Sequence, residues 1–142
     1  MMNKLPDIII NNDQSSIPVN FDIAHFSLAV CQHLQLVFDH LEITLLSPAA
    51  IQVMNFDYFK NDTPTDTISF NLSPDEGITG DIYLCPDVIY ENSKRYATQF
   101  NEEFKIVIIH SLLHLQGHTD ETTDDHEKMN QLQQKIYQEL SY

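Results

Sequence analysis

Two periodicities alternate along the N-terminal half of the chain. Residues 7–10 end in three isoleucines and are typical of a short first strand, and residues 41–45 alternate strictly between apolar and polar side chains. The second pattern is that of a half-buried strand. Between these two strands, apolar residues at spacings of three and four predict a helix with Asn20 as its N-cap. Ser47 followed by Pro48 starts a further short helix, which should end near residue 55.

Two further strands are predicted in the middle of the chain. Residues 67–71 are rich in strand-forming side chains, with Ile68 and Phe70 on one face, and residues 81–84 have a similar composition. The segment 73–77 between them has the residues of a loop. The two strands should therefore be neighbours.

Helical patterns fill the rest of the chain. Pro86 closes the strand region and permits a helix, and Asn101 begins the most apolar helix of the chain, which Gly117 ends. That helix is apolar nearly all round, so it should be buried on several sides. A last helix covers residues 123–140, with apolar residues at spacings of three and four.

The predicted element order is βαβαββααα, which favours an α/β (α+β) fold with a small mixed sheet of about four strands and about five helices. Apolar residues make up 42% of the 142 residues and charged residues 20%, a balance typical of a folded chain. No repeat or Gly/Ser/Pro-rich linker interrupts the sequence. We therefore expect a single domain over residues 1–142.

The chain is strongly acidic, with 21 acidic and 7 basic residues and a formal net charge of −14. This charge excludes a broadly basic nucleic-acid coat and argues against docking on an anionic membrane. It leaves open an enzyme of nucleic acids, because a bound cation or a local basic strip can neutralise phosphates.

Cysteine usage and hydropathy favour a cytoplasmic protein. The two cysteines, Cys31 and Cys85, lie far apart and outside any CxxC pair. No apolar stretch approaches the ~18 residues of a membrane span, so we expect no membrane partner.

Two histidines stand one helical turn apart on the predicted buried helix. Side chains at positions i and i+4 project from the same face about 5 to 6 Å apart, so His110 and His114 can both reach one cation. The alternative is a purely structural role, in which both histidines belong to the core and form ordinary hydrogen bonds. The spacing within so apolar a helix, followed by Gly117, favours a metal site.

The third ligand has two candidates. Asp120 can reach the site if the helix ends at Gly117, whereas His118 would share the histidine face only if the helix continued straight. The glycine favours Asp120. Three protein ligands leave a position for water, which is typical of catalytic zinc, and nickel would suit the same nitrogen and oxygen donors.

Ser111 follows the first histidine where zinc peptidases carry a glutamate that acts as general base. Without that base, the pattern favours hydrolysis of an ester or phosphodiester over hydrolysis of a peptide. The catalytic base itself is not identified.

Several linked motifs carry a family resemblance. They are Met54-Asn55, Tyr58, Asp62, Pro64-Thr65-Asp66, Ser69-Phe70, Gly80-Asp81-Ile82, and residues 110–117 with the sequence HSLLHLQG. In this order they resemble the YbeY family, the metal-dependent endoribonucleases of bacterial ribosomal RNA maturation. The resemblance implies an α/β fold with the metal helix against a small mixed sheet, and three metal-binding positions at His110, His114 and Asp120.

The resemblance also implies residues around the substrate. Asn55, Thr65, Asp66 and Ser69 match family positions near the cleft, although turn capping would explain them as well. The family has an arginine at the position of Phe59, which cannot pair with a phosphate. Lys94 and Arg95, two basic residues that follow one another in the sequence, are our first candidates for phosphate contacts.

Three functions follow, in order of preference. The first is a zinc-dependent, single-strand-specific endoribonuclease of 16S rRNA 3′-end maturation and ribosome quality control. The second is an assembly factor that binds a ribosomal protein or a GTPase and has a structural or vestigial metal site; its acidic surface would meet basic partners. The third is a zinc peptidase, which shares the histidine spacing.

Overall fold

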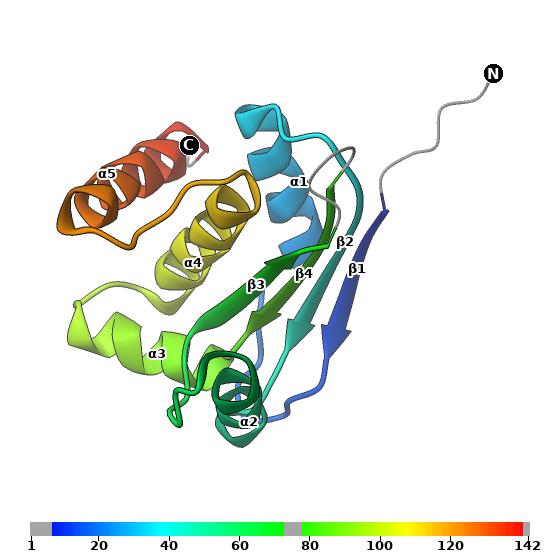
Figure 1. The fold of residues 1–142 in the computed structure, drawn as a ribbon, viewed down its shortest axis with the longest axis vertical. Helices are drawn as coiled ribbons and strands as arrows, with labels where there is room; N and C mark the ends of the chain where they lie inside the picture. The colour runs from blue at the N-terminus through cyan, green and yellow to red at the C-terminus, as the bar shows by residue number, and fades with distance from the viewer. Residues whose placement is uncertain (1–6, 73–77, 141–142) are drawn as a thin grey trace.

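A four-stranded mixed sheet and five helices make up the described part of the chain, residues 7–72 and 78–140 (Figure 1). In chain order this computed structural model contains β1 (Asp7–Asn12), α1 (Ile23–Leu34), β2 (Phe38–Leu45), α2 (Pro48–Phe59), β3 (Thr67–Asn71), β4 (Ile78–Leu84), α3 (Pro86–Arg95), α4 (Phe100–Leu115) and α5 (Thr123–Leu140). This order confirms the predicted fold class. The loop predicted over residues 73–77 lies outside the described residues.

The sheet has the strand order β1-β2-β4-β3. β1 and β4 both pair with β2 in parallel, whereas β3 runs antiparallel to β4 and forms an edge of the sheet. Figure 1 shows α1, α4 and α5 gathered beside one face of this sheet, with α2 at one end of the strands. None of the described helices is both long and apolar enough to cross a lipid bilayer.

Alternation along β3 decides what each of its faces contacts. Thr67 Oγ1 lies 2.8 Å from Ser111 Oγ, and Asn71 Nδ2 donates to the carbonyl oxygen of Leu115 at 3.2 Å, so this face of β3 meets α4. Ile68 and Phe70 pack on the other face with residues of α2 and β4. The edge strand thus lies between α4 and α2.

The helix α4 is buried on several sides, as its composition predicts. Nine of its sixteen residues are buried, and it contacts α1, α3, α5, β3 and β4. Gly80 of β4 permits the close approach of its last turn, because a Cβ at this position would lie 2.7 Å from Leu115 Cδ1. The buried helix is therefore a rigid support for side chains at its C-terminal end.

Several predicted boundaries are wrong by a few residues. The N-cap of α1 is Asp22, whose side chain accepts from the His25 amide, and not Asn20. α2 continues to residue 59 because Lys60, in the left-handed conformation, caps it by donating to two carbonyl groups of its last turn. α4 begins at residue 100, not 101.

Three strands extend beyond the predicted ranges because their backbones stay paired with a neighbouring strand there. β1 ends at residue 12, β2 begins at residue 38 and β4 begins at residue 78. Pairing between the strands extends these ends beyond the short apolar runs of the sequence.

Candidate metal centre

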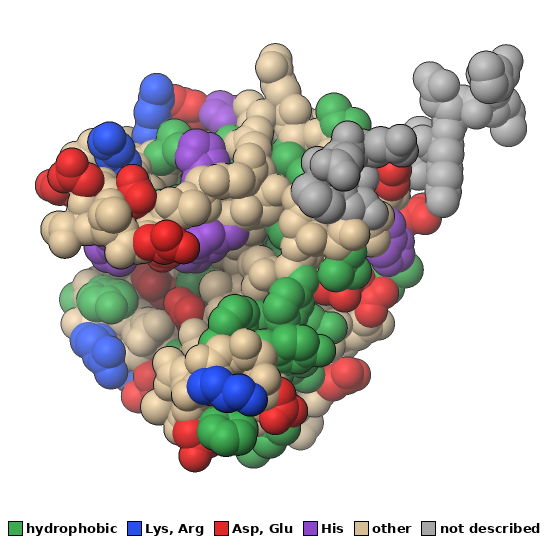
Figure 2. Space-filling view, viewed as in Figure 1, with side chains coloured by type: hydrophobic (Ala, Val, Ile, Leu, Met, Phe, Trp, Pro, Cys, Tyr) green, Lys and Arg blue, Asp and Glu red, His purple; other side chains and the backbone are tan. Residues whose placement is uncertain are grey.

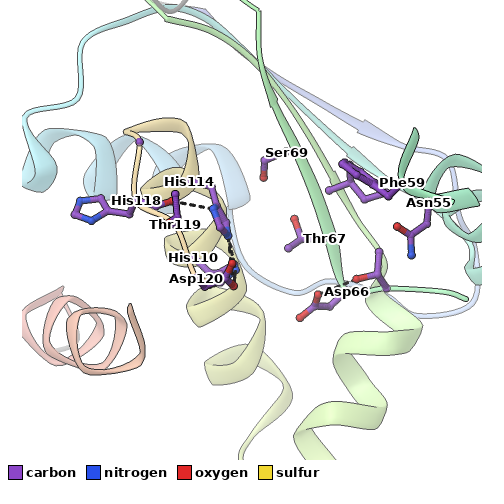
Figure 3. Close-up of a pocket in the computed structure, with 13 residues that line it drawn as sticks. Asn55, Phe59, Asp66, Thr67, Ser69, His110, His114, His118, Thr119 and Asp120 are labelled. Atoms are coloured by element: carbon purple, nitrogen blue, oxygen red, sulfur yellow. Dashed lines mark hydrogen bonds and ion pairs between the residues drawn. The ribbon is translucent and has the colours of Figure 1, made fainter. Parts of the chain in front are cut away.

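His110 and His114 lie on one face of the last turns of α4, and Asp120 lies on the loop that follows (Figure 3). The two Nε2 atoms are 2.9 Å apart. Asp120 Oδ2 lies 3.6 Å from the Nε2 of His110 and 3.8 Å from that of His114. One nitrogen or oxygen atom from each residue thus lies within 4.8 Å of the other two.

The loop reaches this position because α4 stops abruptly. Gly117 has a φ of 105°, a conformation that L side chains rarely adopt, and the amide of His118 donates to the carbonyl oxygen of Leu113. The chain then turns back over the histidine face. Figure 3 shows the His118 ring directed away from the other two histidines, whereas Asp120 points toward them.

Hydrogen bonds orient both histidine rings. The Nδ1 of His110 donates to the side-chain oxygen of Gln133 on α5, and the Nδ1 of His114 donates to the carbonyl oxygen of His118 at 3.0 Å. With their Nδ1 protons used in this way, both rings present an Nε2 lone pair to the same space. This is the second-sphere pattern of metal-binding histidines.

The donor set fits a divalent cation. Two ligands that each lie 2.0–2.1 Å from a tetrahedral zinc ion are about 3.3 Å apart, close to the three separations found here. Without a cation, two nitrogen lone pairs and a carboxylate oxygen would face one another at close range. The set of two imidazoles and one carboxylate leaves a fourth position for water.

Burial also favours the ligand form of the imidazole. Desolvation lowers the pKa of His114 below its ordinary value, and a charge on His110 would lower this pKa further, whereas the Asp120 carboxylate raises it. Desolvation is the largest of these effects, and the lowered pKa favours the neutral imidazole, the form in which a histidine binds a metal.

A cavity of about 590 Å³ opens beside these three side chains. It lies between the end of α4 with its loop on one side, and β3 and α2 on the other (Figure 3). The four residues predicted near the cleft all line this cavity: Asn55, Thr65, Asp66 and Ser69. The fold therefore brings the predicted substrate positions and the three candidate ligands to one place.

These lining residues differ in what they contact. Asn55 is buried and donates from Nδ2 to the Thr63 carbonyl at 3.0 Å, so it holds the loop after α2. Thr65 Oγ1 is 3.4 Å from Asp66 Oδ1, a long contact. Ser69 lines the cavity, but its Oγ is buried and has no hydrogen-bond partner among the described residues.

The predicted basic pair lies elsewhere. Lys94 and Arg95 end α3, and neither lines the cavity. Lys94 Nζ lies 3.3 Å from Glu91 and 4.5 Å from the centre of the Tyr90 ring. The fold does not bring this pair to the three candidate ligands.

Sequence reasoning missed two residues that contact or adjoin the site. Gln133 lies on the buried side of α5, and its signal was a polar residue four positions after Met129 on the apolar stripe. Phe59 was treated as a departure from the family pattern, yet it lines the cavity. Ser111, by contrast, is buried and bonded to Thr67 and the Val107 carbonyl, so it faces β3 and not the cavity.

Comparison with known proteins identifies relatives over most of the chain. The family described as "Endoribonuclease YbeY" matches residues 9–141. The protein named Endoribonuclease YbeY from Protochlamydia amoebophila is 33% identical over 125 residues, or 83% of each chain. The proteins of the same name from Chlorobium luteolum and Thermotoga petrophila are 40% identical over 87 residues and 36% identical over 100 residues.

These matches cover 61% and 70% of this chain, and 64% and 66%, about two thirds, of the two relatives. Among solved structures, the solution structure of TM1509 from Thermotoga maritima has a TM-score of 0.55 and 25% identity, and covers 94% of this chain and 91% of its own. The family match over residues 9–141, the fold and the linked motifs agree: the chain belongs to the YbeY family.

Proposed function

We propose that this protein is a metal-dependent endoribonuclease that hydrolyses single-stranded RNA. One observation carries the proposal: the donor atoms of His110, His114 and Asp120 converge at the wall of a cavity large enough for a small ligand. The names of its relatives support RNA as the substrate. The family resemblance favours ribosomal RNA, 16S 3′-end maturation, ribosome quality control and a cytoplasmic location.

His110, His114 and Asp120 would hold the ion, which we propose to be zinc, with nickel as the alternative. A cation of this kind supplies Lewis acidity toward a phosphate oxygen and lowers the pKa of water when bound. The protein would orient the two imidazole rings and balance part of the charge of the cation. Gln133 and the His118 carbonyl hold the two rings, and the Asp120 carboxylate offsets one positive charge.

The remaining polar groups of the cavity would position RNA. Ser69 and Asp66 both line the cavity, and Asp66 adds a second carboxylate to its wall. Asn55 would act indirectly, because its side-chain amide donates to the Thr63 carbonyl and so holds the loop that carries Thr65. We assign no general base among them.

A second candidate is a ribosome assembly factor that binds a ribosomal protein or a GTPase. The net charge of −14 favours it, as does the lack of Lys or Arg among the lining residues in the described part of the chain. A zinc peptidase is the weaker candidate, because Ser111 is used in packing α4 against β3.

The purified protein is expected to cleave a single-stranded RNA oligonucleotide and to leave a duplex of the same sequence intact. Chelation should stop cleavage, and addition of zinc should restore it, because the cation is the Lewis acid that the proposed reaction needs. Gel analysis of labelled RNA measures both steps. Failure of fresh, zinc-loaded protein to cleave any RNA would favour the assembly factor, and chelator-sensitive casein cleavage would revive the peptidase.

Substituting Gln133 with leucine is expected to weaken zinc binding by about 10- to 100-fold, the usual cost of losing a second-sphere partner. Leucine removes the acceptor that holds the Nδ1 proton of His110 and so frees the ring to rotate or change tautomer. Competition with a chromogenic chelator measures the zinc affinity. Gln134→Leu, an exposed change on the same helix, is the matched control; equal affinities in the two folded variants would remove Gln133 from the site.

A further inference from the structure

A cluster of aromatic rings lies beside the cavity, and one of these rings, Phe59, lines it. Tyr58 and Phe59 lie at the end of α2, Phe70 lies on β3, and Tyr83 lies on β4. The Phe59 ring is parallel to that of Phe70, with 6° between their planes and 6.2 Å between centres. Tyr58 and Tyr83 approach Phe70 at 5.0 Å and 6.3 Å, so Phe70 forms the centre of a four-ring cluster.

Two rings of this cluster remain exposed although they are held in place. Phe59 is 56% exposed and Tyr58 is 65% exposed. Figure 2 shows hydrophobic side chains gathered on this face, next to the hollow where histidine side chains reach the surface. Contact with Phe70 limits the motion of both rings, so little conformational entropy would be lost when a flat ligand stacks on them.

One ring of the cluster lines the same cavity as the candidate metal centre. Phe59 lines it together with His110, His114 and Asp120. The lining residues of β3 come from both of its faces, Thr67 and Ser69 on the α4 side and Ile68 on the other. The cavity thus adjoins the edge strand β3 and has the Phe59 ring and the candidate ligands in its lining.

The charges in this cavity select the kind of contact a nucleic acid could make there. Among the described residues that line it, none is Lys or Arg and two are aspartates. Ion pairs with the phosphates are therefore absent from this wall, whereas an exposed aromatic ring can stack on a base of any sequence. Paired bases already have their faces covered within the duplex, so stacking here selects unpaired nucleotides.

We propose that Phe59, supported by Phe70, is a stacking subsite for one unpaired base of the RNA next to the bond that is cleaved, and that it contributes the preference for single strands. This inference rests on the proposed endoribonuclease function. It assigns Phe59 as a specificity-determining residue and Phe70 as the residue that positions it.

The test measures RNA binding and cleavage separately. Binding of a fluorescently labelled ten-nucleotide single-stranded RNA is followed by anisotropy in chelator, where no cleavage occurs, and KM and kcat are then measured with zinc. Phe59→Ala is expected to weaken binding about 5- to 150-fold, the range for loss of one stacked base, and to raise KM by a similar factor with little change in kcat. Phe59→Tyr should bind as the wild type does.

Phe56→Ala is the matched control, because Phe56 is 47% exposed on the same helix and does not line the cavity. An RNA with an abasic nucleotide supplies the second control: moving the abasic position along the strand should reveal one position at which the wild type loses affinity and Phe59→Ala does not. Thermal unfolding checks that Phe59→Ala remains folded, as an exposed position predicts.

The outcomes separate this inference from the proposed function. Cleavage by the wild type with an unchanged KM in Phe59→Ala would overturn the subsite and leave the endoribonuclease in place. Phe59-dependent RNA binding without cleavage would support the subsite and count against the enzyme. If Phe59→Ala lost binding of a purified ribosomal protein but bound RNA normally, the aromatic cluster would be a protein-docking surface and the inference would be wrong.

Discussion

Replacing His114 with alanine is expected to lower the rate of RNA cleavage about 1000-fold, which corresponds to about 4 kcal/mol of lost transition-state stabilisation. The substitution removes one of three nitrogen or oxygen donors and leaves the other two too few to retain a cation against solvent. Elemental mass spectrometry on the purified variant should find far less than one zinc ion per chain. RNA cleavage is measured in parallel with added zinc.

Folding should survive this change, because the His114 side chain is 30% exposed and its apolar helix neighbours carry the packing. His40→Ala is the matched control: its side chain is 31% exposed and pairs with Glu42 instead of a candidate ligand. A folded His114→Ala protein that cleaves RNA as fast as His40→Ala would contradict the metal mechanism.

Asp120→Ala and His118→Ala are expected to differ by at least about tenfold in zinc affinity and in cleavage. The Asp120 carboxylate lies within 3.8 Å of both candidate ligand nitrogens, whereas the His118 ring points away from them (Figure 3). His118 serves the site through its main-chain carbonyl, which alanine keeps. Zinc content by elemental mass spectrometry and the cleavage rate are compared for the two variants.

Asp120→His completes this series. Histidine would supply a third nitrogen donor in place of the carboxylate oxygen, so this variant should hold zinc at least as well as the wild type. The net charge of the site and the acidity of a zinc-bound water would change. Faster zinc loss from Asp120→His, or equal losses from Asp120→Ala and His118→Ala, would assign the third ligand to another residue.

The N-terminus of one helix illustrates how local sequence signals compete. Asn20 and Asp22 are both good N-caps, and the apolar pattern that follows does not distinguish a start at either. In the fold, Asp22 accepts the amide of His25, which leaves Asn20 outside the helix. At the end of α2, Lys60 adopts a left-handed conformation that is uncommon for lysine, so composition alone predicted an earlier end.

In the candidate metal centre, too, only part of the arrangement could be predicted from the sequence. The positions of His110 and His114 on one face follow from helix geometry, because residues four apart are always neighbours there. Asp120 comes from a loop, and its approach depends on the conformation of Gly117 and on where α5 begins. The metal-ligand roles of all three residues stay predictions.

The amino-acid sequence by itself determined the order of strands and helices, the burial of α4 and the shared face of its two histidines, because each depends on periodicities within one segment. Only the tertiary structure decided that Gln133 of α5 holds His110, that Phe59 and Phe70 stack, and that Lys94 and Arg95 lie away from the cavity. The physical reason is the range of the interactions. Backbone geometry links residues three or four apart, whereas contacts between distant segments depend on how whole elements pack into one core.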